Sequence, residues 1–386
     1  MKRVVLALAL TCSACSTSRL LDVAMRSADE PRAPHGLRVG DREVLAGDMH
    51  THVMPPDAPY HVSRELPSTL ELASKEGLDF VVLTPHVPAR FFEDEDERGW
   101  VLETQAQLRA RLAALHPAMI VVPGMEYTDY RFGHVGLAFA DVREVLADVP
   151  TEAAQQRPEL FFERWRAHGG LATINHPVER PIATAPFRQL RADLSWRAFT
   201  GAPVPPEIGW ITHHADAVET FNLSISHLRD PYFLGDEDRS LREATHLVEA
   251  ASRAQHRRIA PVGGTDSHGE WLRPTTYVLA RTRTEGGIRD AIREARTCVR
   301  APEACTLQVR AADGEWHIVG DALPATDRVE ARASGGAVTF VVNGVIAAEA
   351  PSDTVVSLPI DHCALVRAVV GRSWSAPIYV GCDVAR

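Results

Sequence analysis

Short apolar runs alternate with amphipathic stretches over residues 44–296 of the chain. The apolar runs are rich in β-branched residues and predict strands at 44–49, 79–84, 119–123, 134–140, 171–175, 216–221, 259–264 and 275–280. The amphipathic stretches predict helices at 67–75, 100–115, 158–168, 239–255 and 284–296. Residues 178–214 contain several prolines and little periodicity, so we expect a loop insertion there. This alternation predicts an α/β fold in which a parallel sheet closes into a barrel.

The pattern changes after Cys298 to short alternating segments separated by Gly or Asp turns. These segments predict strands at 306–310, 329–332, 337–342, 354–358, 364–370 and 377–380. Several strands at this spacing favour a small β-sandwich. Because this region has no cluster of His and Asp, we expect it to serve packing or attachment. The expected organisation is a barrel over residues 42–300 and a sandwich over residues 301–386.

The N-terminus has the pattern of a bacterial export signal. Residues 1–3 are basic, residues 4–10 are apolar, and residues 11–15 are small and polar, which is too short to span a bilayer. Ser13-Ala14-Cys15 resembles the end of a lipoprotein cleavage site, which would place a lipid on Cys15; plain secretory cleavage is the alternative. Residues 16–41 are then a tether. The protein is expected in the cell envelope or periplasm, attached to the membrane only through that lipid.

Cysteine usage agrees with export. Four cysteines remain outside the signal, and none has Cys-x-x-Cys spacing. In an oxidising compartment we favour the pairs Cys298–Cys305 and Cys363–Cys382. Four buried free thiols are the alternative.

Composition narrows the class of partner. The 386 residues are 45% hydrophobic and 24% charged, as in ordinary globular proteins. The formal net charge is −10, and no run of Lys and Arg in the sequence is longer than a pair such as Arg257-Arg258. Since affinity for long nucleic acids comes from many phosphate contacts, a small-molecule substrate fits better. The oligomeric state is left open.

Potential metal ligands follow the predicted strands. They are His50, His52, Asp57, His86, Glu126, His134, His176, Asp266 and His268. Strand ends converge on one face of an α/β barrel, which would bring these side chains together. The period-two spacing of His50 and His52 points both imidazoles to one side, and the same holds for Asp266 and His268. Imidazole and carboxylate ligands suit Zn²⁺, Mn²⁺ or Fe.

The order of these segments resembles the polymerase-and-histidinol-phosphatase (PHP) family over residues 42–300. The matching residues are His50 and His52 of the family's His-x-His, His86 of Thr-Asp-His, Glu126 of Gly-x-Glu, His134 shortly after it, His176 of His-Pro, and Asp266 and His268 of Asp-x-His. Two positions depart from the pattern. Pro85 replaces the Asp of Thr-Asp-His, and the usual Ser-Asp-Gly is Pro56-Asp57-Ala58, which leaves His61 as a rival to Asp57.

The resemblance implies a distorted (β/α)7 barrel with two or three divalent ions (Zn, Mn or Fe) and hydrolytic activity. A barrel followed by a sandwich in an exported chain is similar to the carbaryl-hydrolase-like branch of the family. The residues expected to take part in catalysis are Asp48, His86, Glu126, His176 and Asp266.

Other polar residues have expected roles around the site. Asp48 is expected to hold the second ring nitrogen of a ligand His. Glu219 and Asn222 are expected to line the pocket without binding metal, with strand-end hydrogen bonding as the alternative. Arg131 and Arg273 could contact an anionic group, or could be surface or ion-paired residues. His213-His214 precedes a strand and is interpreted as structural.

These features favour metal-dependent hydrolysis of a small phosphoester through a metal-bridging hydroxide. No Ser nucleophile elbow, Cys/His pair or Gly-rich nucleotide loop is found in the sequence. The alternatives are hydrolysis of a carbamate, ester or amide on the same site, and a catalytically silent binding module displayed on the envelope.

Overall fold

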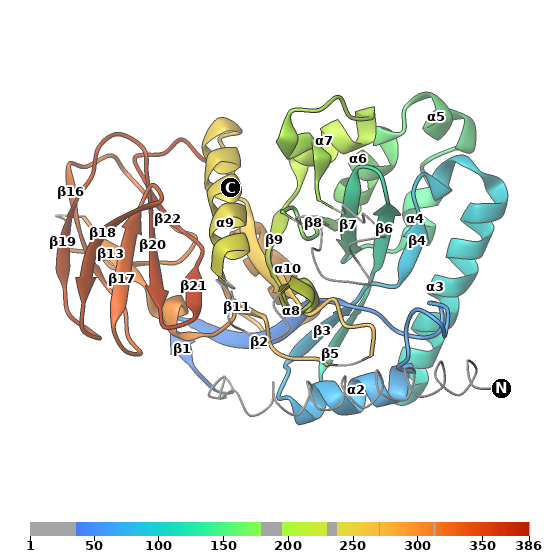
Figure 1. Cartoon of the computed structure of the whole chain (residues 1–386), viewed down its shortest axis with the longest axis horizontal. Helices are drawn as coiled ribbons and strands as arrows, with labels where there is room; N and C mark the ends of the chain where they lie inside the picture. The colour runs from blue at the N-terminus through green and yellow to red at the C-terminus, as the bar shows by residue number, and fades with distance from the viewer. Residues whose placement is uncertain (1–35, 179–194, 230–237, 270, 312–313, 386) are drawn as a thin grey trace, which may run out of the picture.

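The computed structural model describes residues 36–178, 195–229, 238–269, 271–311 and 314–385. The export signal, Cys15 and tether residues 16–35 lie outside the described residues. Figure 1 shows an α/β body with a β-rich C-terminal region at one end, and helix α9 (Asp238–Ala254) between the two. Among the described helices, none combines the length and apolarity that a membrane crossing requires.

The α/β body contains twelve strands. They are β1 (Arg38–Val39), β2 (Arg42–Thr51), β3 (Phe80–Leu83), β4 (His86–Pro88), β5 (Ile120–Pro123), β6 (Met125–Asp129), β7 (Gly133–Ala138), β8 (Leu171–Ile174), β9 (Ala217–Asn222), β10 (Ala260–Gly264), β11 (Thr276–Ala280) and β12 (Thr297–Val299) among the described residues. Besides α9, its helices are α2 (Leu66–Lys75), α3 (Glu95–Leu115), α4 (Val142–Ala147), α5 (Thr151–Gln156), α6 (Glu159–Ala167), α7 (Pro206–His214), α8 (Leu223–Arg229) and α10 (Glu285–Arg293), with 3₁₀ turns η1 (Phe91–Glu93) and η3 (Arg197–Thr200).

The strands of the body form two sheets that curl into a half-barrel. Strands β2, β3 and β5 are parallel neighbours, with β11 antiparallel beside β2. The second sheet has the order β10-β9-β8-β7-β6-β4. The backbone after β10 lies against the end of β2, where the Asp266 N–H donates to the His50 carbonyl at 2.8 Å and the His52 N–H donates to the Ser267 carbonyl at 3.0 Å. The ends of both sheets therefore meet at one place.

The predicted parallel sheet is confirmed in part. The β2–β3–β5 and β8–β9–β10 pairings are parallel, but β7 is antiparallel to β6 and β8, and β11 is antiparallel to β2. A short turn joins β6 to β7, and such a connection can only make an antiparallel hairpin. The pairing is thus mixed and divided between two sheets, and it does not reproduce the (β/α)7 count.

Two further sequence expectations differ from the structure. The predicted loop at 178–214 contains helix α7, which begins after Pro205 with Pro206 in its first turn, a favoured position for proline. Strands β4 and β6 and helices α4, α5 and α8 were not predicted, because each is too short to show a period. Helix α3 begins at Glu95, earlier than expected. Its N-cap Asp94 accepts from the Asp96 and Glu97 N–H groups at 3.0 Å.

The C-terminal region is β-rich, as predicted. Its elements are η4 (Glu303–Thr306), β13 (Gln308–Arg310), β14 (His317–Ile318), β15 (Ala322–Leu323), β16 (Arg328–Arg332), β17 (Val338–Val342), β18 (Val345–Ala350), β19 (Val356–Pro359), β20 (Ala364–Val370), β21 (Ser373–Ser375) and β22 (Ile378–Val380). One sheet has the order β14-β13-β16-β19, and the other strands continue the sheet of the body through the antiparallel pair β12–β21. Apolar residues of both sheets, including Val329 and Phe340, bury one common core.

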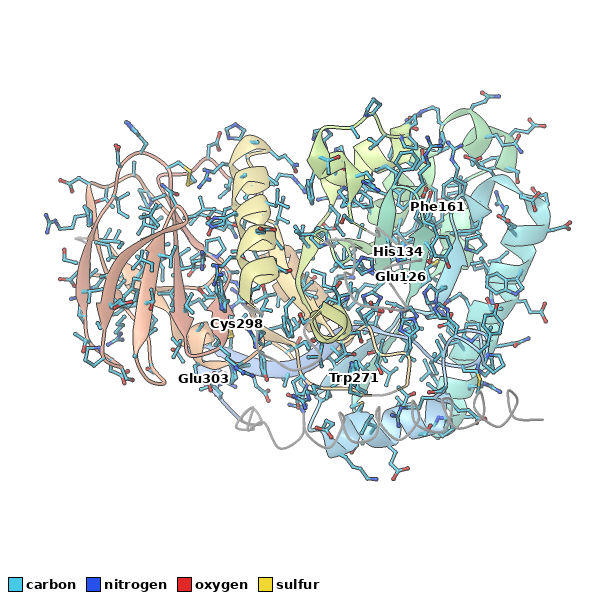
Figure 2. All side chains as sticks on the ribbon, viewed as in Figure 1. Glu126, His134, Phe161, Trp271, Cys298 and Glu303 are labelled. Atoms are coloured by element: carbon cyan, nitrogen blue, oxygen red, sulfur yellow. A yellow bond between two sulfur atoms is a disulfide. The ribbon has the colours of Figure 1, made fainter. Side chains whose placement is uncertain are left out.

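The two predicted disulfides are confirmed, because Cys298 is bonded to Cys305 and Cys363 to Cys382. Figure 2 labels Cys298 on the C-terminal side of the body. A buried ion pair also joins the two regions: Arg367 Nε on β20 lies 2.7 Å from Glu249 Oε1 on α9. The C-terminal region is therefore attached by a shared sheet and a buried charge pair.

Candidate metal centre

Strand β2 carries the first two histidines into the interior. It is buried along almost its whole length, and the alternation of side chains places His50 and His52 on one side, with ring centroids 5.1 Å apart. The close approach of Gly264 on β10 makes room for this arrangement. A Cβ at Gly264 would collide with the His50 Cβ and with Glu219 Oε1. Both imidazoles are nearly inaccessible to solvent.

Glu126 on β6 lies at the centre of the cluster. Its Oε1 lies 3.1 Å from His50 Nε2, 3.3 Å from His134 Nδ1 and 3.6 Å from His176 Nε2. The Asn175 side chain donates from Nδ2 to the same oxygen at 2.8 Å. Figure 2 shows Glu126 and His134 side by side within the body. One carboxylate oxygen thus faces three imidazoles.

The other oxygen of Glu126 faces a different pair of histidines. Its Oε2 lies 3.4 Å from His86 Nε2 and 3.7 Å from His52 Nε2, and it accepts no hydrogen bond from the described residues although it is buried. A buried carboxylate oxygen without a donor is costly unless a cation or a water satisfies it. The carboxylate thus lies between two sets of imidazoles.

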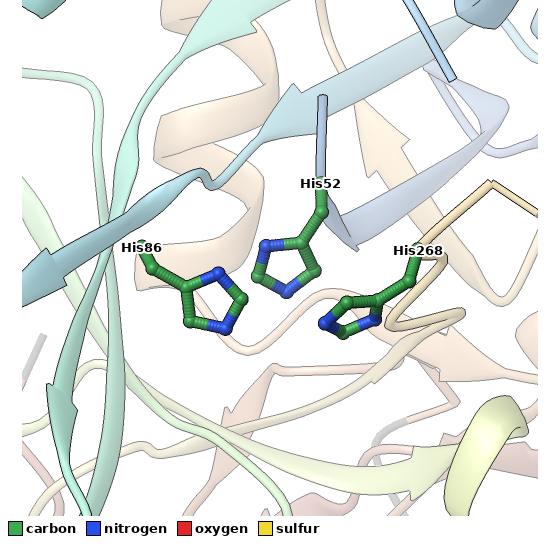
Figure 3. Close-up of side chains that lie close together, drawn as sticks. All are labelled: His52, His86 and His268. Atoms are coloured by element: carbon green, nitrogen blue, oxygen red, sulfur yellow. The ribbon is translucent and has the colours of Figure 1, made fainter. Parts of the chain in front are cut away.

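Three overlapping groups of side chains among the described residues could hold a metal ion, each with ligand atoms within 4.8 Å of one another. They are His52, His86 and His268; His50, His52 and Glu126; and Glu126, His134 and His176. Figure 3 shows the three rings of the first group converging. His52 and Glu126 are each shared by two groups, so neighbouring ions would have common ligands.

Asp266 lies beside the first two groups. Its Oδ1 is 3.1 Å from His52 Nε2, 3.5 Å from His50 Nε2 and 3.6 Å from His268 Nδ1. Asp266 has φ 51° and His176 has φ 28°, conformations that cost energy for residues with a side chain. Two of the sequence-predicted ligands are therefore held by the surrounding structure in backbone conformations that are unfavourable on their own.

Asp57 is also at the cluster, but its carboxylate binds the far side of the histidines. Oδ2 lies 3.2 Å from His52 Nδ1, and Oδ1 lies 2.9 Å from His86 Nδ1 and accepts the His86 backbone N–H at 3.0 Å. Both Nε2 atoms then point toward Glu126. The geometry differs from the expectation that Asp57 is a metal ligand, because both of its oxygens are used in orienting ligand imidazoles.

Glu219 and Asn222 on β9 do the same for the other side of the cluster. Glu219 Oε1 accepts from His50 Nδ1 at 3.1 Å, and its Oε2 accepts from the His176 N–H at 2.7 Å. Asn222 Nδ2 lies 3.1 Å from both Glu219 Oε2 and Asp266 Oδ2. Glu219 and Asn222 line a pocket beside His176 and also make the hydrogen bonds at the end of β9 that were the alternative expectation.

Asp48 has a different role from the one expected. It holds no ring nitrogen of a histidine in the described structure. It accepts from the His50 N–H at 3.0 Å, the Thr265 N–H at 2.9 Å and the Thr51 hydroxyl at 2.9 Å, and the Thr265 hydroxyl also donates to it. Burial raises the pKa of Asp48 to about 6. Through these hydrogen bonds Asp48 connects the end of β2 to the segment that carries Asp266. Asp48 therefore positions the neighbouring candidate ligands and has no contact that would make it a reacting group.

The remaining candidates lie around the cluster or away from it. The His61 ring stacks on His86, with centroids 4.6 Å apart, and lies tilted against His268, with centroids 4.7 Å apart. Arg131 is exposed with its guanidinium over Phe132, whereas Arg273 is buried.

His213-His214 forms the last turn of α7. There the His214 ring stacks on Trp210 and its Nδ1 donates to the Trp210 carbonyl at 2.8 Å. This arrangement agrees with the structural interpretation of the pair.

The electrostatics of the protein without metal favour carboxylate–imidazolium pairs. Burial opposes charge on His52, but hydrogen bonds to Asp266 and Asp57 outweigh it and raise its pKa to about 9. Burial likewise opposes charge on Glu126, yet the neighbouring His50 and His134 hold its pKa well below the ordinary value. Burial and the proximity of His52 lower the pKa of His268 to about 4. Positive charge is thus strongly favoured at the centre of the cluster, where divalent cations could supply it.

Sequence reasoning missed three contributors. Asn175, which donates to Glu126, stands directly before His176, and its position beside a proposed ligand was a usable signal. Thr265 precedes Asp266 in the same way and binds Asp48. The need for glycine at position 264 had no signal in the sequence, because it arises from β10 packing against residues of β2 and β9.

Comparisons with known proteins are limited to solved structures, since no protein-family model and no curated protein matches the chain. A two-domain protein of Bacteroides vulgatus, described as containing a predicted PHP-like metal-dependent phosphoesterase, is 15% identical with a TM-score of 0.46, covering 90% of this chain and 98% of that one. PsfC of Pseudomonas syringae is 12% identical with a TM-score of 0.37, covering 64% and 87%. Endonuclease Q, bound to a duplex with an abasic lesion, is 14% identical with a TM-score of 0.35, covering 64% and 56%. All three TM-scores are under 0.5, so this likeness carries no conclusion about the activity of the chain.

Proposed function

We propose that this protein is a metal-dependent hydrolase of small phosphoesters. The observation that carries the proposal is the buried Glu126 carboxylate, with Oε1 facing one set of imidazoles and the unpartnered Oε2 facing another. A carboxylate in that position can bridge two cations. Imidazole and carboxylate donors match Zn²⁺, Mn²⁺ or Fe, and the overlapping ligand groups provide for two or three ions.

Divalent ions bound here would supply a deprotonated water at neutral pH and neutralise the charge that develops on phosphoryl oxygens. The protein's own residues prepare the site for this chemistry. Asp57 and Glu219 accept the Nδ1 protons of ligand histidines and so direct Nε2 of His50, His52 and His86 into the cluster. Rigid placement of ligands by such partners increases metal affinity and activity.

Among the described residues, the imidazoles of the cluster differ in exposure. The side chains of His50 and His52 have 1% and 0% of their surface exposed, whereas those of His86 and His268 have 18% and 23%. His86 and His268 are thus better placed to meet a substrate than His50 and His52. The burial of His50 and His52 limits access of bulk water to them, which strengthens electrostatic interactions within the site.

A carbamate, ester or amide substrate is the alternative chemistry on the same ligands. Three overlapping ligand groups favour the phosphoester, because a transferring phosphoryl group carries more oxygens to neutralise than a carbonyl. A catalytically silent binding module is the alternative from another class. Several carboxylates and imidazoles are buried together at the cluster, and such groups are costly to desolvate. A silent binding module offers no physical reason for that cost.

The proposal also places the protein outside the cytoplasm. The two disulfides fit an oxidising compartment, and the N-terminal sequence fits an export signal with a lipid on Cys15. A small-molecule substrate in the periplasm or cell envelope agrees with the absence of a broad basic run in the sequence.

The test is a panel of activities after removal and replacement of metal. The stripped protein is reconstituted with Zn²⁺, Mn²⁺ or Fe²⁺ and assayed on an aryl phosphate, a nucleotide phosphate and an aryl carbamate. Phosphate turnover that disappears in His50→Ala and persists in His246→Ala supports the proposal; His246 is an exposed residue on α9 and serves as the matched control. Carbamate turnover alone would favour the alternative chemistry, and inactivity with every metal would favour the binding module.

A further inference from the structure

Two tyrosines beside the cluster are exposed to an unusual degree. Tyr60 is 93% exposed and Tyr130 is 72% exposed, the two highest values among the large apolar and aromatic side chains of the described residues. Large exposed aromatic surface often marks a binding site. Neither ring contributes to a described apolar core, so folding does not explain either one.

Each tyrosine stands on a turn that is firmly anchored to the site. The Ala58 carbonyl accepts the N–H groups of His61 and Val62, each at 2.9 Å, and Val62 is fully buried. The same turn includes Asp57, which binds two of the ligand histidines. Tyr60 is therefore presented on rigid backbone.

The turn that carries Tyr130 is equally fixed. It joins β6 to β7, and Asp129 Oδ1 accepts the Arg131 and Phe132 N–H groups at 2.8 and 3.0 Å. The two strands that leave this turn carry Glu126 and His134. A ring held on such a turn loses little conformational entropy when it binds a ligand.

The two turns approach the cluster at different ligand groups. Tyr60 is adjacent to His61, whose ring stacks on His86 and lies tilted against His268, two members of the first group. Tyr130 packs edge-on against His134 of the third group, with centroids 5.7 Å apart. The Glu126 carboxylate joins these two groups, because its Oε1 lies 3.3 Å from His134 Nδ1 and its Oε2 lies 3.4 Å from His86 Nε2. The two tyrosines therefore flank imidazoles that face one carboxylate.

We propose that Tyr60 and Tyr130 form an aromatic subsite at the mouth of the metal cluster, which holds a planar ring of the substrate beside the phosphoryl group. This inference rests on the proposed function and makes its substrate class narrower: phosphoesters whose organic group contains an aromatic or heteroaromatic ring. Rings stack on tyrosine without hydrogen-bond readout, so the subsite selects flat substrates over flexible aliphatic ones. The hydroxyl groups are not needed for this role.

The test compares binding of two non-hydrolysable probes to the metal-loaded protein. Phenylphosphonate and methylphosphonate share the phosphonate and differ in the ring, and their Kd values are measured by titration calorimetry. Each variant, Tyr60→Ala and Tyr130→Ala, should weaken phenylphosphonate about tenfold while leaving methylphosphonate unchanged, as expected for loss of one stacking partner. Tyr60→Phe and Tyr130→Phe should keep the parent's values, and Trp100→Ala, at a half-exposed ring on α3, is the matched control.

Turnover of 4-nitrophenyl phosphate, adenosine 5′-monophosphate and glycerol phosphate then separates the two proposals. A higher kcat/KM for the two ring-bearing esters than for glycerol phosphate, reduced by the alanine variants, supports the subsite. The ratio of kcat/KM for 4-nitrophenyl phosphate to that for adenosine 5′-monophosphate then distinguishes aryl from nucleobase substrates. Equal Kd values for both phosphonates in the parent, with phosphoester turnover intact, would overturn the subsite and leave the proposed function standing. Selective phenylphosphonate binding without turnover of any phosphoester would retain the subsite and overturn the function. Failure of both phosphonates to bind, together with no turnover of any phosphoester, would overturn both.

Discussion

Replacing Asp57 by Asn tests whether this residue orients the metal ligands or is itself one. The carboxylate accepts from Nδ1 of His52 at 3.2 Å and from Nδ1 of His86 at 2.9 Å. An amide of the same shape has one accepting oxygen and one donating nitrogen, so it can satisfy only one of the two Nδ1–H groups. The other imidazole then loses its partner and its fixed orientation.

The magnitude follows from that single lost contact. A hydrogen bond to a charged group contributes about 1.5–3 kcal/mol, which corresponds to roughly 10- to 100-fold in an equilibrium constant. Changes in partners behind metal ligands have effects of about that size on metal affinity. We therefore expect Asp57→Asn to bind metal about 10- to 100-fold more weakly and to recover the parent's metal content and most of its activity at saturating metal.

The assay is competition with a chromophoric chelator, combined with elemental analysis of the metal content at saturation. Asp94→Asn is the matched control, because it makes the same substitution at an N-cap on α3, where Asn and Asp are equally suitable. Loss of a whole ion per chain at saturating metal would show that Asp57 is a direct ligand, as the sequence pattern suggested. An unchanged affinity would show that its two hydrogen bonds are irrelevant to binding, and either result refutes the reasoning.

Four further outcomes are expected. Glu126→Gln should lower the number of bound ions and reduce kcat at least about 100-fold, since a bridging ligand is lost; full metal content by elemental analysis would contradict this. Because the pKa of His52 is raised to about 9 and a ligand imidazole must be neutral, apparent metal affinity should increase as pH rises from 6.5 toward 9, by about tenfold per unit for one displaced proton, whereas a flat titration would disprove the coupling. Arg367→Met leaves the buried Glu249 unpaired and should lower the free energy of unfolding by about 3–5 kcal/mol in urea titrations; a loss under about 1 kcal/mol would mean that the pair contributes little. Cys15→Ala should release the protein from the membrane fraction, and unchanged partitioning would rule out a lipid there.

The side chains that the sequence singles out as candidate ligands are brought together by the structure, whereas parts of the fold around them differ from the prediction. His50 and His52 can be recognised from the sequence, because residues two positions apart in a strand lie on the same face, whichever strands pair with it. All nine proposed ligands lie at one cluster, because the ends of the two sheets meet there. Their roles were harder to assign. Asp57 contacts Nδ1 of His52 and of His86 because of the backbone course of the turn that carries it, and the sequence pattern does not specify that course.

The misassigned parts of the fold have a common physical cause. Strand β6 is buried at four successive positions, on both faces, and strand β4 has only three residues, so neither produces a period of two. The antiparallel direction of β7 follows from the short connection after β6, which the strand pattern alone does not encode. Asp48 was placed behind a histidine because of its position next to the motif, but its oxygens are taken by backbone N–H groups and threonine hydroxyls that only the fold brings near.

The pair β12–β21 has a consequence for how the chain can be divided. Cys298 and Val299 are hydrogen-bonded across to Ser375 and Trp374, so a chain that stops at residue 300 would leave β12 as an open edge. Unprotected edges recruit strands from other molecules, and such a fragment would tend to aggregate however well its metal ligands were placed. The C-terminal region is therefore not structurally independent of the α/β body. Any replacement of this region would have to supply a compatible strand at residues 373–375, because that strand completes the sheet that also contains β2.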